Sequence, residues 1–110
     1  MSLLSKKCIP CEVGGIPLSE TQAKELLAQL PQGWSLIGET GIRKEFHFKS
    51  FKDAISFVNR VALLADEEGH HPDIFVKYDI VTIELSTHSI KGLSENDFIL
   101  AAKIEKVVML

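Results

Sequence analysis

The sequence predicts an α+β fold in the order α-β-β-α-β-β-α, with three helices on one face of a four-stranded antiparallel sheet. Three Ser-x-x-Gln or Ser-x-x-Asp patterns mark helix starts at Ser19, Ser50 and Ser94. Two pairs of short alternating segments indicate two hairpins, and the second helix lies between them. Residues 18–110 are therefore predicted to form a single domain after an irregular N-terminal arm at residues 1–17.

The first helix is expected to begin at the capping box Ser19-Glu-Thr-Gln22 and to end before Pro31, because the residue before a proline disfavours the helical conformation. Two strands follow, at residues 34–37 and 42–49, joined by a loop that contains glycine. Alternation in the second strand assigns Arg43, Glu45, His47 and Lys49 to one side of the sheet and the apolar residues to the core side. These apolar residues are Ile42, Phe46 and Phe48.

The longest helix is expected at about residues 51–68, between the cap at Ser50 and Gly69, a residue type that commonly ends helices in the left-handed conformation. Its apolar residues cover more of the helix surface than a single core-facing stripe requires. A helix of this kind must be covered on more than one side. The sequence therefore predicts self-association, as a homodimer or a homotetramer.

The second hairpin is predicted from strands at residues 73–77 and 80–88 around a tight turn at residues 78–79. The closing helix is expected over about residues 94–108, with Asp97 at the third helical position of another capping box. Two hairpins separated by a helix favour an antiparallel sheet whose helices share one face.

Composition excludes several classes of function. The chain has 110 residues, of which 45% are hydrophobic and 25% charged, as in an ordinary globular protein. A net charge of −3 argues against a nucleic-acid surface, which needs a basic stripe. No apolar run approaches the roughly 20 residues of a membrane span, and the N-terminus lacks the apolar centre of a signal peptide. The expected compartment is the cytoplasm.

One Cys-x-x-Cys pair, Cys8 and Cys11, lies in the N-terminal arm. A structural zinc site usually needs four ligands, and the sequence has no second cysteine pair. A redox motif normally opens a helix, whereas glycine and proline residues follow this pair. Its role is left unassigned.

Three of the four histidines, His70, His71 and His88, lie within nineteen residues. If the second hairpin turns at residues 78–79, paired residue numbers sum to about 157 or 158, which places His88 opposite His70 to within one residue. Pro72 favours an extended conformation at His71. His70 and His71 are therefore expected where the helix passes into the strand, beside the far end of the neighbouring strand. His88 has the parity of the polar face of its strand. We therefore expect the three imidazoles to converge.

Converging imidazoles suit either proton transfer or a metal site, because imidazole changes its protonation near neutral pH and is a common metal ligand. The helical His-x-x-x-His pattern of many zinc sites is absent from the sequence. Adjacent histidines on an extended segment point to opposite sides of the chain, so His70 and His71 do not easily face one ion. An acid and a base acting on one substrate fit the spacing better, and no metal is predicted.

Further residues extend the histidine pattern, and the ordered set is Asp66, His70, His71, Pro72, Tyr78, His88 and Asp97. This set resembles the signature of the pterin-4a-carbinolamine dehydratases, and the resemblance runs from Phe46 to Glu105. The dipeptide Gly33-Trp34 also fits, and the arm sequence KCIPCEVGGIPL is similar to bacterial and plant-type members.

The resemblance implies an enzyme that dehydrates 4a-hydroxytetrahydrobiopterin to the quinonoid dihydropterin, in tetrahydrobiopterin recycling, without a metal or bound cofactor. It implies that His70, His71 and His88 carry catalysis and line the pterin pocket. We assign His88 as the acid, His70 as the base and His71 as a positioning residue. The sequence does not fix this order.

Three more signature residues are expected at the substrate site: Asp66, Tyr78 and Asp97. Asp66 is interpreted as orienting a histidine. Hairpin packing is the alternative explanation for Tyr78, and helix capping is the alternative for Asp97. The alternative function is a non-catalytic dimerisation or coactivator module that uses the apolar helical surface. The natural pterin and the choice between dimer and tetramer stay open.

Overall fold

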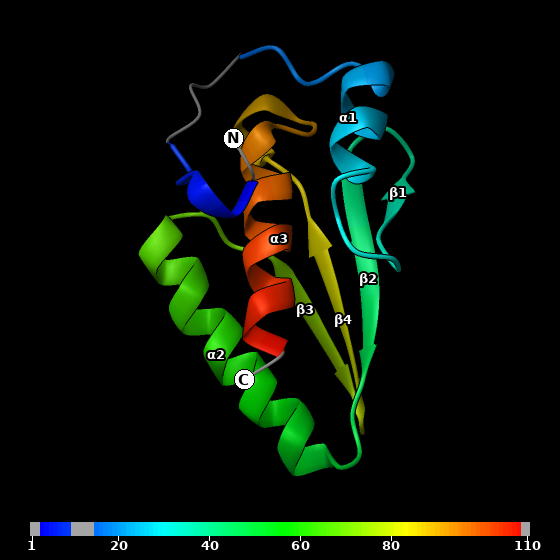
Figure 1. Cartoon of the computed structure of the whole chain (residues 1–110), viewed down its shortest axis with the longest axis vertical. Coiled ribbons are helices and arrows are strands. Elements are labelled where there is room, and N and C mark those ends of the chain that lie inside the picture. Colours follow the sequence, from blue (N-terminus) through cyan, green and yellow to red (C-terminus); the bar gives the residue numbers. More distant parts are fainter. Residues whose placement is uncertain (1–2, 10–14, 109–110) are drawn as a thin grey trace.

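The structure, a computed structural model, describes residues 3–9 and 15–108 (Figure 1). It confirms the predicted α+β class and the predicted order of helices and strands. The α-helices are α1 (Glu20–Leu27), α2 (Phe51–Glu68) and α3 (Glu95–Val108). The strands are β1 (Ser35–Ile37), β2 (Gly41–His47), β3 (Asp73–Lys77) and β4 (Ile80–Leu85). Two short 3-10 helices, η1 (Leu3–Ser5) and η2 (His88–Ile90), complete the described elements.

The four strands form one antiparallel sheet in the order β1-β2-β4-β3. In the β3–β4 hairpin the pairs run from Asp73 with Glu84 to Lys77 with Ile80, so every pair sums to 157. This confirms the predicted turn and register. Tyr78 takes a positive φ of 54° at that turn.

The core lies between the sheet and the helices, and Figure 1 shows α2 and α3 crossing the same face. Alternate residues of β4, Val81, Ile83 and Leu85, are buried against these helices. Phe57 of α2 contacts the ring of Phe46 with the centroids 4.9 Å apart. The opposite face of the sheet carries Arg43, Glu45 and His47 of β2, as alternation predicts.

Local capping signals fix the helix boundaries. Ser19 and Gln22 form the predicted capping box, in which the Ser19 hydroxyl accepts from the Gln22 N–H and the Gln22 amide oxygen accepts from the Ser19 N–H. Ser50 caps α2 by accepting from the Asp53 N–H. Gly69 ends α2 with φ of 67°, where glycine carries no Cβ penalty.

The predicted extent of the last strand is wrong. The prediction carried the strand from Ile80 to His88, but β4 ends at Leu85 and His88 begins η2. The cause is an isolated bridge in which the Thr87 N–H donates to the Gly92 carbonyl over 2.8 Å, which closes residues 88–91 into a tight loop. The parity argument for the orientation of His88 therefore does not apply.

Candidate functional site

The three clustered histidines line one cavity of about 240 Å³, which confirms that they converge. The cavity lies where α2 passes into β3 and where β4 passes into η2. Gly69 turns the chain out of α2, and the β3–β4 pairing from Asp73–Glu84 onward brings the chain before β3 to the same end of the hairpin as the chain after β4. The lining residues of the cavity are Ile9, Gly69, His70, His71, Ser86, Thr87, His88, Ser89 and Asn96.

His70 is held by a buried carboxylate. Its Nε2 lies 2.6 Å from Oδ1 of Asp97, whose exposed fraction is 0%. The His70 side chain is itself largely buried. An ionised carboxylate only accepts hydrogen bonds, so opposite such a carboxylate Nε2 of His70 is the donor; in the neutral tautomer that this selects, Nδ1 is the acceptor nitrogen.

The second carboxylate oxygen of Asp97 accepts two further hydrogen bonds. Oδ2 accepts from the Thr87 hydroxyl at 2.8 Å and from the Ser94 N–H at 3.0 Å. The second of these bonds is the reciprocal half of the predicted capping box, so Asp97 both caps α3 and holds His70. Since the Thr87 hydroxyl donates to Asp97, the Ser94 hydroxyl is left to donate to Thr87 over 2.7 Å. Hydrogen bonds from charged or polar donors are what allow a carboxylate to be buried.

His71 points to a second carboxylate at the surface. Its Nε2 lies 2.9 Å from Oδ1 of Asp66 in the last turn of α2, and both side chains are exposed. The structure thus brings Asp66 to a histidine, in the arrangement expected from the sequence. An exposed contact of this kind orients a ring more than it stabilises the fold.

His88 and Tyr78 occupy different ends of the β3–β4 hairpin. His88 is exposed at the start of η2, between Thr87 and Ser89, which also line the cavity. Tyr78 is exposed in the turn at the opposite end of the hairpin. Among the described residues of the subunit, the lining of the histidine cavity does not include Tyr78.

Sequence reasoning missed Thr87, Asn96 and Ile9 as neighbours of the histidines. A signal for Thr87 was present, because it continues the buried alternation of Val81, Ile83 and Leu85 with a hydroxyl. A polar residue at a buried position needs a partner, and Asp97 is that partner. No comparable pattern in the sequence marks Asn96 or Ile9.

The N-terminal arm packs beside the same site. The backbone N–H of Cys8 donates to Glu68 at 2.9 Å, and Glu68 also accepts from Lys103 of α3 at 2.7 Å. Burial raises the pKa of the Cys8 thiol to about 12, and the negative charge of Glu68 adds to the shift. Cys11, the other cysteine of the pair, lies outside the described residues.

Glu68 anchors the arm through its charge. Burial alone would raise the pKa of its carboxyl, but the hydrogen bonds from Lys103 and the Cys8 N–H, with the charges of Lys103 and Lys7, outweigh burial and lower it. A carboxyl with a lowered folded-state pKa stabilises the fold above its unfolded pKa, and this stabilisation is lost as pH falls through the folded value.

We expect Glu68→Gln to lower the free energy of unfolding by about 1 kcal/mol or more at neutral pH, because Lys103 loses its charged partner. The difference from the parent shrinks as pH falls below about 4, where both proteins carry a neutral side chain. Urea unfolding at several pH values measures it. Glu67→Gln, the exposed carboxylate next to it, is the control, and a pH-independent Glu68→Gln difference would contradict the assignment.

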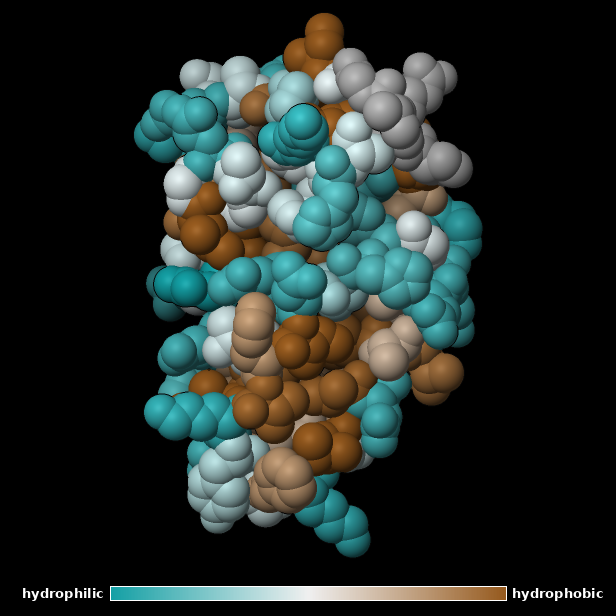
Figure 2. Space-filling view, turned by 180° about the vertical axis from the view of Figure 1, so that it is seen from behind, coloured by the Kyte–Doolittle hydropathy of each residue, from teal (hydrophilic) through white to brown (hydrophobic). Residues whose placement is uncertain are grey.

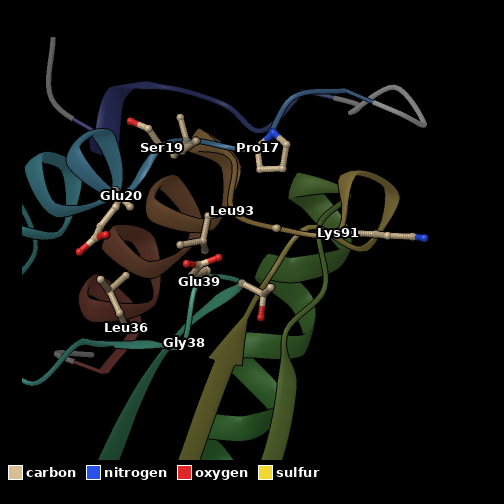
Figure 3. A pocket seen from close by; sticks show the side chains of 12 residues that line it. Pro17, Ser19, Glu20, Leu36, Gly38, Glu39, Lys91 and Leu93 are labelled. Carbon is tan, nitrogen blue, oxygen red and sulfur yellow. The ribbon is translucent and has the colours of Figure 1, made fainter.

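A larger cavity, of about 590 Å³, lies elsewhere, between the start of α1, the β1–β2 loop and residues 91–93 (Figure 3). Its lining combines the apolar side chains of Leu36 and Leu93 with the carboxylates of Glu20 and Glu39. Glu20 is paired with Lys24 at 2.8 Å. No histidine of the described residues lines this cavity, which separates it from the smaller cavity that the three histidines line.

Two further findings hold for residues 3–9 and 15–108. In that part of the chain no α-helix combines the length and the hydropathy needed to traverse a bilayer. Nor do those residues place three or more His, Cys, Asp or Glu side chains where they could hold one metal ion.

The fold and the cavity together define a class of small α+β proteins, in which a histidine held by a carboxylate and two further histidines line one cavity. Comparison with known proteins narrows the class. The family model described as pterin 4 alpha carbinolamine dehydratase matches residues 16–107. The chain belongs to this family, as the signature residues had indicated.

Individual relatives agree over nearly the whole length. A protein of Alkaliphilus metalliredigens is 47% identical over 96% of this chain and 95% of its own, and one of Nitrosospira multiformis is 50% identical over 94% and 89%. Both are provisionally named as pterin-4-alpha-carbinolamine dehydratases.

Two solved structures have a similar fold. A transcriptional coactivator/pterin dehydratase from Brucella melitensis has a TM-score of 0.79 at 35% identity, covering 84% of this chain and 98% of the other. A pterin dehydratase-like protein described as a RuBisCO assembly factor of the alpha-carboxysome has a TM-score of 0.61 at 25% identity, covering 70% and 90%. The family fold is therefore found in proteins described by more than one role.

Proposed function

We propose that the protein dehydrates 4a-hydroxytetrahydropterins, such as 4a-hydroxytetrahydrobiopterin, to the quinonoid dihydropterin by histidine acid–base catalysis. The observation that carries the proposal is the short contact between His70 and the buried carboxylate of Asp97, at a cavity shared with two more imidazoles. A base oriented by a buried carboxylate is a recurring arrangement for proton transfer. Membership of the dehydratase family names the substrate class.

His70 is proposed as the base. With its Nε2–H donated to Asp97, the neutral ring offers Nδ1 to accept a proton, and the fixed carboxylate stabilises the imidazolium that forms. The reaction removes a hydroxyl from the carbinolamine carbon and a proton from the adjacent ring nitrogen. His70 accepts the nitrogen proton as the carbon–nitrogen double bond forms.

His88 is proposed as the acid. Its protonated ring gives a proton to the departing hydroxyl, so that the carbon–oxygen bond breaks and water leaves. His88 then ends neutral and His70 protonated, and exchange with solvent restores both rings. His71, oriented by Asp66, positions the substrate. A substrate role for Tyr78 stays a prediction from the resemblance.

The test is the rate at which purified protein removes synthetic 4a-carbinolamine, followed by the loss of its absorbance. Acceleration over the buffer rate supports the proposal. An inert wild-type protein contradicts it and favours the alternative, a dimerisation or coactivator module. In the proposed role the protein recycles tetrahydrobiopterin in the cytoplasm and needs no metal or bound cofactor.

We also propose that the protein works as a homodimer or homotetramer. β3 is an edge strand, and its Val76 side chain is 40% exposed. Figure 2 shows apolar side chains gathered on the lower half of the face opposite to that of Figure 1. Exposed apolar patches and unpaired strand edges are common sites of association. On α2, Phe51 and Leu63 are also exposed, consistent with its broad apolar pattern.

We expect Val76→Lys to shift the protein toward the monomer of 12.2 kDa, because a charge at this edge opposes strand pairing and apolar burial. Light scattering after size-exclusion chromatography measures the mass. Ile16→Lys is the control. It places the same charge at another exposed aliphatic residue, away from β3, and is expected to keep the wild-type mass. A monomeric wild-type protein at micromolar concentration would reject self-association.

A further inference from the structure

The N-terminal arm is bound to the ends of α2 and α3 next to the histidine cavity. Leu3 is buried in the core, and Lys6 pairs with Glu95 at 2.8 Å. Cys8 is buried and its N–H donates to Glu68, which is itself fixed by Lys103. Residues 3–9 therefore have a defined position against the domain.

Asn96 fixes the last described residue of this segment. Its amide oxygen accepts from the Ile9 N–H at 3.0 Å, and its amide nitrogen donates to the Ile9 carbonyl at 2.5 Å. The Asn96 side chain thus pairs with both polar backbone groups of Ile9, as a neighbouring strand would. Asn96 is buried in the first turn of α3, one residue before Asp97.

The side chain of Ile9 lines the histidine cavity. It is 70% exposed although its backbone is fixed, and it lines the cavity with the three histidines. It is the sole aliphatic side chain among the described lining residues, since the others are histidines, small polar residues, Asn96 and a glycine. Binding sites for flat heterocycles combine polar groups that orient the ligand with apolar surface that covers its face.

We infer that Ile9 is a substrate-binding residue: held by Asn96, it forms the apolar wall of the cavity and packs against a face of the pterin ring. This inference rests on the proposed function and deepens it. Ile9 has no proton to transfer, so its contact stabilises the bound substrate and the transition state equally. Losing such a contact raises KM and leaves kcat unchanged.

The test compares Ile9→Ala, Ile9→Leu and Ile16→Ala with the wild type. Ile9→Ala removes apolar surface from the contact and is expected to raise KM about tenfold, with kcat within about twofold. Ile9→Leu keeps the apolar volume and is expected to restore KM. Ile16→Ala alters an isoleucine that is 93% exposed and does not line the cavity, so its KM is expected to match the wild type.

Binding of a stable 7,8-dihydropterin, measured by calorimetry, separates this inference from the proposed function. Weaker binding of the dihydropterin by Ile9→Ala, with an unchanged melting temperature, supports a contact between Ile9 and the pterin ring. Unchanged KM and unchanged dihydropterin affinity overturn it, even where the wild type is an active dehydratase. A wild type that binds the dihydropterin but does not turn over the carbinolamine overturns the proposed catalysis, and Ile9 is then decided by the affinity alone. A wild type that neither binds the dihydropterin nor turns over the carbinolamine overturns both.

Discussion

Replacing His70 or His88 by alanine is expected to lower kcat for carbinolamine dehydration by about 10²–10⁴-fold in each case, the usual contribution of one positioned proton-transfer group. Each variant retains the other imidazole and the cavity, so turnover slows without being abolished. Initial rates of carbinolamine loss at saturating substrate measure the effect. The physical reason is that water must then replace the missing imidazole. In His88→Ala water protonates the departing hydroxyl, and in His70→Ala water accepts the proton of the ring nitrogen.

His47→Ala is the matched control for these variants. His47 ends β2, is exposed, and lies 3.5 Å from Glu45, outside the cavity. Its loss is expected to leave kcat and KM at their wild-type values. Wild-type turnover by His70→Ala and His88→Ala would reject the catalytic assignment of these two histidines.

Replacing Asp97 by alanine is expected to lower the free energy of unfolding by about 3 kcal/mol or more. Three donors lose their acceptor, namely His70 Nε2, the Thr87 hydroxyl and the Ser94 N–H. Each buried polar group left without a partner costs about 1–3 kcal/mol. Urea unfolding measures the loss. A change below about 1 kcal/mol would contradict the assignment of Asp97 as the centre of this network.

Asp97→Asn tests the role of the carboxylate in catalysis, since it preserves the shape of the side chain. Its amide has one acceptor atom and one donor atom, so it cannot accept from all three neighbours. Where the NH₂ group faces His70, the ring proton moves to Nδ1 and the acceptor toward substrate is lost. We expect kcat to fall at least about 100-fold, with ¹⁵N spectra showing the altered tautomer of His70. Wild-type kcat with the wild-type tautomer would remove Asp97 from the mechanism.

Most of the fold follows from local signals in the sequence. Ser19 and Ser50 begin helices, Gly69 ends one, and alternation assigns the faces of β2 and β4, because caps and alternation depend on near neighbours. The end of β4 was predicted wrongly. It depends on the bridge between Thr87 and Gly92 and on the burial of the Thr87 hydroxyl against α3, which are tertiary interactions.

The site was predictable to the same extent. The convergence of the histidines followed from the hairpin register, and the contact between Asp66 and His71 agrees with the expected orienting role. Asp97 was expected either as a cap or near the substrate, and it caps α3 while it holds His70. The place of Ile9 was not predictable, because the arm has no periodic pattern and its position is set by Asn96 and Glu68.

Asp97 both caps α3 and holds His70, so its presence in a related protein does not by itself indicate activity. A protein that had abandoned dehydration would still need this buried aspartate to begin its last helix. The solvent-facing imidazoles of His71 and His88 contribute little to folding and can disappear without structural penalty. Under the proposed function, the presence of His71 and His88 is therefore more informative about dehydratase activity than the presence of Asp97.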